Sequence, residues 1–270
     1  MNNTENSPAQ GNILDKIVVK KWQEIEIAKT EISIKSLEES EFFSRNCYSM
    51  RDFILNPSLT GIIAEFKRKS PSKGIINDRN TVEEVTTAYV AAGASALSVL
   101  TDESFFGGHK KDLIAARRAN DIPILRKDFM LDEFQIIEAK SLGADIILLI
   151  AAILSPAKVQ KLARCAKNLG LNVLLEVHNL EELNRSLCDD LDAVGVNNRN
   201  LGNFSVSVQH SYDLADHIPS QFLKISESGI SDPATIKELR DAGFDGFLIG
   251  ENFMKEEDPG RAMEEFVKQL

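Results

Sequence analysis

Short apolar runs rich in isoleucine, valine and leucine recur along most of the chain, and amphipathic segments separate them. The runs lack the apolar–polar alternation of a strand with one face in water, so we expect a parallel sheet that is covered on both faces. Between the runs, apolar residues recur at helical spacing. The predicted strands cover residues 61–66, 95–100, 122–126, 144–150, 171–177, 192–196, 222–226 and 245–249.

Capping residues indicate where the intervening helices begin and end. Thr81 and Glu84 have the spacing of a capping box. Ser155, Asp232 and Asp258 each precede a proline, which is favoured at the first position of a helix. Glycines that follow the helical segments are expected to end them in a left-handed conformation. These glycines are Gly93, Gly143, Gly170 and Gly243.

Eight strands that alternate with helices favour an α/β fold, a closed (β/α)8 TIM barrel, over a doubly wound sheet. A doubly wound sheet normally carries a glycine-rich phosphate motif after its first strand, and the sequence contains neither G-x-G-x-x-G nor a P-loop. Helical patterns at 13–25, 37–43 and 50–55 predict an N-terminal helical extension. We expect a disordered leader at 1–10 and a single catalytic domain over 11–270, with the extension at 11–58.

The composition is that of a globular protein, with 43% hydrophobic and 27% charged residues. The 41 acidic and 31 basic residues give a net charge of -10, which argues against nucleic acid or an anionic membrane as a partner. Three separate cysteines, without a C-x-x-C motif, indicate neither a disulfide framework nor a zinc site. Because we find no apolar signal segment and no run long enough to cross a bilayer, we expect a cytoplasmic protein.

Polar residues end the predicted strands, at the face where barrels of this kind carry their active sites. Side chains two residues apart on a strand point the same way, which places Glu65 with Lys67 and Asn197 with Arg199. Two lysines and three glutamates at one mouth are expected to push their pKa values apart, which suits acid–base catalysis. The inward-facing set is Glu65, Lys67, Lys127, Glu176, Asn197, Arg199 and Glu227.

Other charges near the strand ends are interpreted differently. We expect Arg126, Asp128 and Lys224 to be solvated loop charges, whereas Asp102 and Glu103 could be either loop charges or functional groups. A basic loop over 67–74 is expected to be mobile and to close over an anionic substrate, with Arg68 and Lys69 themselves solvated.

Two glycine turns predict a phosphate site. Ser228-Gly229 follows the seventh predicted strand, and Gly250 follows the eighth and precedes a short helix. Barrels often bind phosphate at these two loops through backbone N–H groups and a helix N-terminus. Glycine lets the backbone approach the ligand closely.

Six segments closely resemble indole-3-glycerol phosphate synthases, in order and over nearly the whole chain. The segments are IIAEFKRKSPSKG (62–74), SVLTDESFFGG (98–108), ILRKDFMLDEFQI (124–136), LLEVH (174–178), VGVNNRNL (194–201) and ISESGI (225–230). The resemblance implies cyclisation of 1-(2-carboxyphenylamino)-1-deoxyribulose 5-phosphate to indole-3-glycerol phosphate, with release of carbon dioxide and water. It implies no cofactor and no metal, and we expect a monomer.

The resemblance also assigns roles to residues. It implies that Lys127 is the general acid, that Glu176 is the carboxylate that stabilises the ring cation, and that Lys67 serves the dehydration step and contacts substrate anions. We expect apolar neighbours to make the Lys127 proton easier to release. Glu65 would orient the lysines. The implied substrate contacts are Ser70, Phe129, Leu148, Asn197, Arg199, Glu227 and Ser228, and the phosphate contacts are Gly229, Gly250, Glu251 and Lys67.

Alternative functions remain open at this point. A Schiff-base aldolase that uses Lys127 or Lys67 as the nucleophile would share the phosphosugar barrel. A barrel that only binds a phosphorylated metabolite would need neither Lys127 nor Glu176. A phosphoribosylanthranilate isomerase is rejected, because we expect a cysteine where this chain has Glu65. Glu251 departs from the small hydroxyl residues common in the family, and it would be tolerated if only its N–H faced the phosphate.

Overall fold

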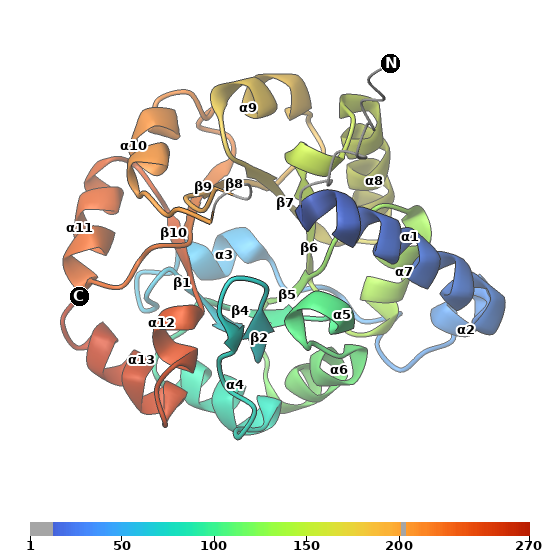
Figure 1. Ribbon diagram of the computed structural model, residues 1–270, viewed down its shortest axis with the longest axis horizontal. Helices are drawn as coiled ribbons and strands as arrows, with labels where there is room; N and C mark the ends of the chain where they lie inside the picture. Colours follow the sequence, from blue (N-terminus) through green and yellow to red (C-terminus); the bar gives the residue numbers. More distant parts are fainter. Residues whose placement is uncertain (1–12, 201–203) are drawn as a thin grey trace, which may run out of the picture.

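Eight parallel strands close into a barrel at the centre of the molecule (Figure 1). The computed structural model describes residues 13–200 and 204–270. Each strand pairs with the next along the chain, and β10 pairs with β1, for example Phe247 with Ile62. The closed (β/α)8 barrel predicted from the sequence is therefore confirmed. The strands are β1 (Ile62–Phe66), β4 (Ala96–Leu100), β5 (Ile124–Lys127), β6 (Ile146–Ile150), β7 (Asn172–Val177), β8 (Ala193–Asn197), β9 (Leu223–Glu227) and β10 (Gly246–Ile249).

Helices surround the barrel, as expected for strands that are apolar on both faces (Figure 1). The Thr81–Glu84 capping box is present, and the side chains of Ser155, Asp232 and Asp258 each accept a backbone N–H at a helix start. The outer helices are α4 (Val82–Ala91), α6 (Lys110–Ala119), α7 (Glu133–Ser141), α8 (Pro156–Asn168), α9 (Leu180–Ser186), α10 (Gln209–Ala215), α11 (Pro233–Asp241) and α13 (Pro259–Val267). Shorter elements at the rim are α5 (Glu103–Phe106), η1 (Ala151–Ile153) and α12 (Glu251–Met254).

The N-terminal extension covers both ends of the barrel. In Figure 1, α1 (Ile13–Glu31) crosses the near side of the molecule next to α7 and α8, while α3 (Met50–Ile54) lies behind the strands. Met50 and Ile54 are buried against the side chains that fill the barrel interior, such as Leu125 and Leu174. The leader predicted at 1–10 lies outside the described residues.

The second helix of the extension is shorter than predicted. α2 (Ile34–Glu38) ends four residues after it begins, whereas the pattern had suggested a helix over 37–43. Turns follow α2, and the hydroxyl of Ser40 donates to the carbonyl of Ser141 in α7. The segment between α2 and α3 is fixed to the barrel by the buried carboxylate of Asp145, which precedes β6. This carboxylate accepts from Arg45 at 2.7 Å and from the Tyr48 N–H at 2.8 Å.

The basic loop after β1 forms a small hairpin of β2 (Lys69–Ser70) and β3 (Gly74–Ile75). Arg68 precedes the hairpin. It was predicted to be solvated, but its side chain is only partly exposed and is paired. Its guanidinium is paired with Asp112 of α6, with a 3.0 Å contact from Nη2 to Oδ1, and lies 4.7 Å from the Phe66 ring centre. The base of the hairpin is thus attached to the barrel by charge and by packing.

Candidate active site

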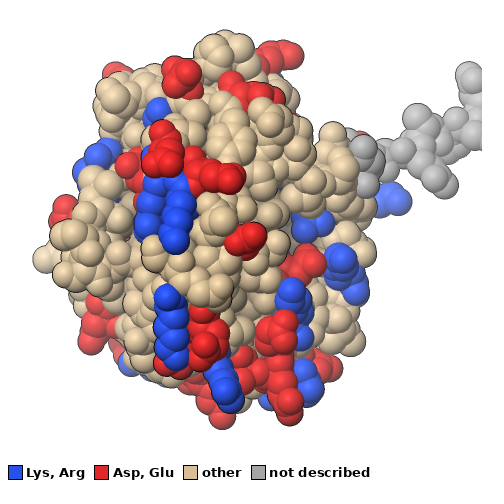
Figure 2. Space-filling model, turned by 90° about the vertical axis from the view of Figure 1, so that its left-hand side faces the viewer, with Lys and Arg blue, Asp and Glu red and all other residues tan. Residues whose placement is uncertain are grey.

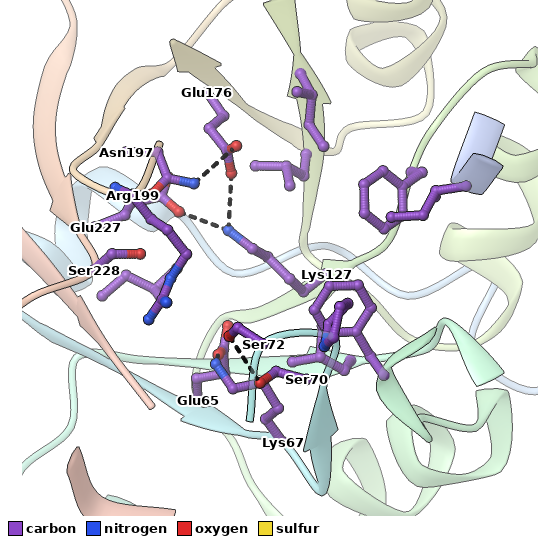
Figure 3. Close-up of a pocket in the computed structure, with 18 of the residues that line it drawn as sticks. Glu65, Lys67, Ser70, Ser72, Lys127, Glu176, Asn197, Arg199, Glu227 and Ser228 are labelled. Carbon is purple, nitrogen blue, oxygen red and sulfur yellow. Dashed lines mark hydrogen bonds and ion pairs between the residues drawn. The ribbon is translucent and has the colours of Figure 1, made fainter. Parts of the chain in front are cut away.

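The polar residues predicted from the strand ends meet in one cavity at the carboxyl ends of the barrel strands (Figure 3). The cavity also receives side chains from α1 and from the hairpin. Predicted catalytic and substrate-contact residues that line it are Glu65, Lys67, Ser70, Lys127, Phe129, Leu148, Glu176, Asn197, Arg199, Glu227 and Ser228. An adjoining pocket shares Lys67, Arg199 and Glu251 with this cavity and includes Gly229 and Gly250.

Lys127 lies at the centre of the charged groups (Figure 3). It ends β5, and its ammonium Nζ lies 2.6 Å from Glu227 Oε2 and 3.2 Å from Glu176 Oε2. The amide of Asn197 donates to the other oxygen of Glu176 at 3.1 Å. These residues come from β5, β7, β8 and β9, so the cluster forms only when these strands have assembled in one sheet.

A second ion pair lies at the end of β1. Lys67 Nζ is 2.7 Å from Glu65 Oε1, as expected for side chains that point the same way from one strand. The hydroxyl of Ser98, on the neighbouring strand β4, donates to the other oxygen of Glu65 at 3.2 Å. Glu65 is buried, and burial would raise its pKa, but Lys67 and Lys127 lower the pKa below its ordinary value.

The two carboxylates that share Lys127 titrate differently. Burial, reinforced by the nearby Glu176 carboxylate, raises the pKa of Glu227 to about 7. Burial acts in the same direction on Glu176, but the Lys127 ammonium outweighs it and lowers the pKa of that carboxyl. One carboxylate is therefore held ionised while the other can take up a proton near neutral pH, as acid–base chemistry requires.

The prediction that Lys127 releases its proton easily is wrong for the substrate-free site. Burial does lower the pKa of Lys127, but the carboxylates of Glu227 and Glu176 outweigh it, and the pKa lies above its ordinary value. The sequence pattern showed apolar neighbours on the strand, whereas the ammonium itself contacts charges from other strands.

One end of the cavity is apolar and aromatic. The rings of Phe106 and Phe129 lie 5.9 Å apart, and Leu148 is buried beside them in the lining. Ile13 and Ile17 of α1 complete this wall. Sequence reasoning assigned no role to Phe106 or to α1. The apolar face of the α1 pattern signalled burial, but it did not indicate what the helix covers.

The opposite end is lined by backbone turns. Ser228 and Gly229, directly after β9, have φ angles of 70° and 79°, and Gly250 precedes the first turn of α12. A Cβ atom on Gly250 would lie 2.6 Å from Glu65 Oε1, so glycine is needed for this close approach. The Glu251 carboxylate lies 3.2 Å from Arg199 Nη2, which partly offsets its negative charge at this end of the cavity.

Glycine also makes room for the central carboxylate. A Cβ atom on Gly195 of β8 would lie 2.1 Å from Glu227 Oε1, well inside van der Waals contact. Glu227 can therefore reach Lys127 only because position 195 on the neighbouring strand β8 has no side chain.

Of the three charges predicted to be solvated, Arg126 and Asp128 are buried and Lys224 is partly buried. Arg126 is only 1% exposed, and its Nη2 contacts Glu138 Oε2 at 2.8 Å and Asp128 Oδ2 at 3.2 Å. Asp128 also binds the ammonium of Lys21 in α1, at 2.9 Å. Lys224 lies within β9, and its ammonium donates to a backbone carbonyl at 2.6 Å. Arg126 and Asp128 thus each have a partner on another element, Glu138 of α7 and Lys21 of α1, which local patterns do not show.

The Lys21 ammonium joins the extension to the catalytic rim. It lies 2.8 Å from Glu24, 2.9 Å from Asp102 and 2.9 Å from Asp128, and its side chain is 5% exposed. Asp102 caps α5, which carries Phe106, and Asp128 directly follows Lys127. Asp102 is therefore a structural residue of the rim and not a free loop charge.

Within residues 13–200 and 204–270, no group of three or more His, Cys, Asp or Glu side chains is arranged to hold a metal ion. The same ranges contain no helix with the length and hydropathy that a membrane span needs.

The family model of indole-3-glycerol phosphate synthase matches residues 14–266. The chain belongs to the indole-3-glycerol phosphate synthase family. An indole-3-glycerol phosphate synthase of Bacteroides thetaiotaomicron is 50% identical over 96% of this chain and 99% of its own length. One from an Acidovorax species is 40% identical over 93% and 97%.

Membership of the indole-3-glycerol phosphate synthase family makes this chain a carboxy-lyase of tryptophan biosynthesis. The predicted family and activity are thus confirmed. Likeness to distant structures shows the fold alone. A 3-hexulose-6-phosphate synthase from Salmonella typhimurium has a TM-score of 0.60 at 13% identity, over 77% of this chain and 98% of that one.

Proposed function

We propose that this enzyme closes the indole ring by acid–base catalysis, with Lys127 as the first acid. The substrate, 1-(2-carboxyphenylamino)-1-deoxyribulose 5-phosphate, has an aromatic ring at one end and a phosphate at the other. The cavity has a matching aromatic end and a glycine-lined end. The observation that carries the proposal is the Lys127 ammonium between them, 2.6 Å from Glu227 and 3.2 Å from Glu176.

In the first step, the ring carbon that bears the carboxylate attacks the ribulose carbonyl carbon. The carbonyl oxygen gains the electron pair and takes a proton from Lys127. Glu227 supports this transfer because its raised pKa, about 7, and its contact with Nζ allow it to return a proton to the amine. Loss of carbon dioxide then returns an electron pair to the ring.

In the second step, the new hydroxyl leaves as water after it receives a proton from Lys67. Glu176 stabilises the cation left by the loss of water and removes a proton from the ribulose carbon that is bonded to nitrogen, which makes the new five-membered ring aromatic. Glu65 contacts Lys67 at 2.7 Å and holds it charged and oriented. Asn197 fixes the Glu176 carboxylate at 3.1 Å.

The remaining residues bind and align the substrate. Phe129 and Leu148 pack against the anthranilate ring, which suits their place at the aromatic end. Glu251 contributes its N–H to the phosphate while its carboxylate binds Arg199. The proposed sugar contacts are Ser70, Asn197, Arg199 and Ser228, and the proposed phosphate contacts are Lys67 and the backbones of Gly229, Gly250 and Glu251.

We further propose that the enzyme works as a cytoplasmic monomer without a cofactor, as the family resemblance implies. One independent domain over 11–270 would then be sufficient for activity. Binding of nucleic acid is not expected at a net charge of -10. On the face drawn in Figure 2, acidic and basic side chains are interspersed among uncharged ones, as expected for a surface without a polyanion site.

The test follows indole fluorescence after the purified enzyme is mixed with the carboxyphenylamino-deoxyribulose phosphate. Lys127→Ala is expected to slow product formation by roughly 10²–10⁴-fold, the usual contribution of a positioned general acid. Lys111→Ala, an exposed lysine of α6, is the matched control and should behave as the wild type.

Two outcomes contradict the proposal. If folded wild-type enzyme forms no product, the assigned reaction is wrong. If Lys127→Ala retains full activity, the reaction stands but its acid is another group. Borohydride reduction in the presence of substrate distinguishes a Schiff-base aldolase from the proposed acid–base mechanism. Only the aldolase would form a Schiff base with a lysine, which borohydride traps as a covalent adduct.

A further inference from the structure

A histidine without an assigned role lies beside the catalytic carboxylate. His178 directly follows β7, and its side chain is 14% exposed. Its Nε2 atom lies 3.6 Å from Glu176 Oε1, and this nitrogen is buried without a hydrogen-bond partner among the described residues. A buried polar atom of this kind calls for a physical explanation.

Glu182 fixes the orientation of the imidazole. One oxygen of Glu182 accepts the backbone N–H of His178 at 2.8 Å and lies 3.2 Å from ring atom Nδ1. Glu182 is itself held at the start of α9, where Asn179 accepts its backbone N–H at 2.9 Å. The carboxylate requires a proton on Nδ1, so Nε2 is the atom that faces Glu176.

This geometry favours the doubly protonated ring. In the neutral ring, the lone pair of Nε2 would point at the anionic oxygen of Glu176, which is repulsive. In the imidazolium, an N–H points at that oxygen instead and attracts it. Burial lowers the pKa of His178, but the contact with Glu182 and the charge of Glu176 outweigh burial and raise the pKa above its ordinary value.

The charged groups around His178 and Glu176 have an excess of negative charge, which favours a cation at this position. Besides His178, Glu176 faces Lys127 from β5, Asn197 from β8 and the carboxylate of Glu227 from β9, which shares Lys127 with it. The imidazole itself faces Glu182 from α9 and feels the more distant charge of Glu227 from β9. Arg185, one turn along α9, acts on Glu182. The three buried glutamates at the centre, Glu65, Glu176 and Glu227, outnumber the two lysines that contact them, Lys67 and Lys127, so an imidazolium reduces an excess of negative charge.

We propose that His178, oriented by Glu182, is a positioning residue whose imidazolium keeps the Glu176 carboxylate ionised and ready to accept the ring proton. The proposal rests on the role given above to Glu176. It adds a charged pair, Glu182 and His178, that the reaction requires although neither residue lines the substrate cavity. His178 faces Oε1 of Glu176, whereas Lys127 contacts Oε2.

The main test is the pH dependence of kcat for His178→Gln. The substitution removes a cation 3.6 Å from Glu176, so the pKa of Glu176 rises and the acid limb of the profile moves to higher pH by about one unit. His217→Gln changes an exposed histidine and is the matched control, with an unshifted profile. A loss of kcat that is equal at every pH, with an unshifted midpoint, would overturn the proposal and leave His178 a packing role only.

A second variant keeps the histidine. Glu182→Gln removes the charge that holds the imidazolium, so NMR titration should show the His178 pKa above its ordinary value in the wild type and lower in the variant. This readout needs no activity and remains informative if a variant is inactive. A wild-type His178 that is neutral at pH 7 would overturn the proposal.

Failure of the underlying mechanism would look different. If Glu176→Gln retains activity, the role given to Glu176 is wrong, whatever the state of His178. If Glu176→Gln is inactive but His178→Gln leaves the acid limb in place, only the inference about His178 fails.

Discussion

Replacing Lys21 by methionine tests how strongly the N-terminal helix is held to the catalytic rim. Methionine keeps most of the side-chain volume and removes the ammonium, which lies 2.9 Å from both Asp102 and Asp128. Both carboxylates are almost completely buried, with side-chain exposures of 1% and 2%. Removal of one partner from a buried ion pair typically costs about 3–5 kcal/mol.

The expected cost for Lys21→Met lies near the lower limit of that range. Asp102 keeps the N–H of Phe105 at 2.8 Å, and Asp128 keeps Arg126 and the hydroxyl of Thr101. A loss of about 3 kcal/mol corresponds to a decrease in Tm of roughly 6–12 °C for a domain of this size.

Two probes separate local from global unfolding in this variant. Trp22 is the single tryptophan of the chain and lies on α1 next to Lys21, so its fluorescence reports on this helix, whereas far-UV circular dichroism reports on the whole barrel. We expect the fluorescence transition in urea to precede the dichroism transition in Lys21→Met and to coincide with it in the wild type. Lys29→Met, on the same helix but 35% exposed, is the control and should change stability by less than about 1 kcal/mol. Equal stabilities of the two variants would refute the reasoning.

Three further predictions concern other buried contacts. Gly195→Ala should lower kcat at least tenfold with a small change in Tm, because the added Cβ would lie 2.1 Å from Glu227 Oε1 and displace that carboxylate. Steady-state kinetics check this, and an unchanged kcat contradicts it. Arg117→Met should cost about 3 kcal/mol in urea unfolding, because the fully buried Asp145 loses its contact with Arg117 at 2.9 Å but keeps the contact with Arg45 at 2.7 Å. The pKa of Asp128 is lowered, since neighbouring cations outweigh burial, so its stabilising effect is complete above about pH 4 and is lost as the pH falls further. Acid unfolding of Asp128→Asn should therefore depend less on pH below 4 than that of the wild type.

Local patterns were sufficient for the barrel and for much of the site. Glu65 and Lys67 are two residues apart on a strand, and strand geometry alone brings them together. Lys127, Glu176 and Glu227 were predicted to converge because parallel strands present their carboxyl ends at one mouth. Their titration could not be predicted, since it depends on which carboxylate oxygens reach the ammonium.

The buried ion pairs outside the cavity could not be predicted. Arg126 points outward from β5, away from the cavity, and the sequence contains no local sign that Glu138 of α7 covers it. Lys21 looks like one of many lysines on an amphipathic helix. These charges are buried and paired because another element of the fold packs over them. Which element packs there is decided by the tertiary fold and not by the local sequence.

The pairing that closes the barrel also constrains how the protein can be made. β1 pairs with β10, so that Ile62 meets Phe247 across most of the chain. A ribosome releases β1 long before β10, and until then the sheet has two unpaired edges that can pair with other chains. Contacts so distant in sequence also form slowly. The catalytic cluster, which joins β5 to β7 and β9, lies within the same late-closing sheet, so activity begins only after almost all of the described chain has emerged.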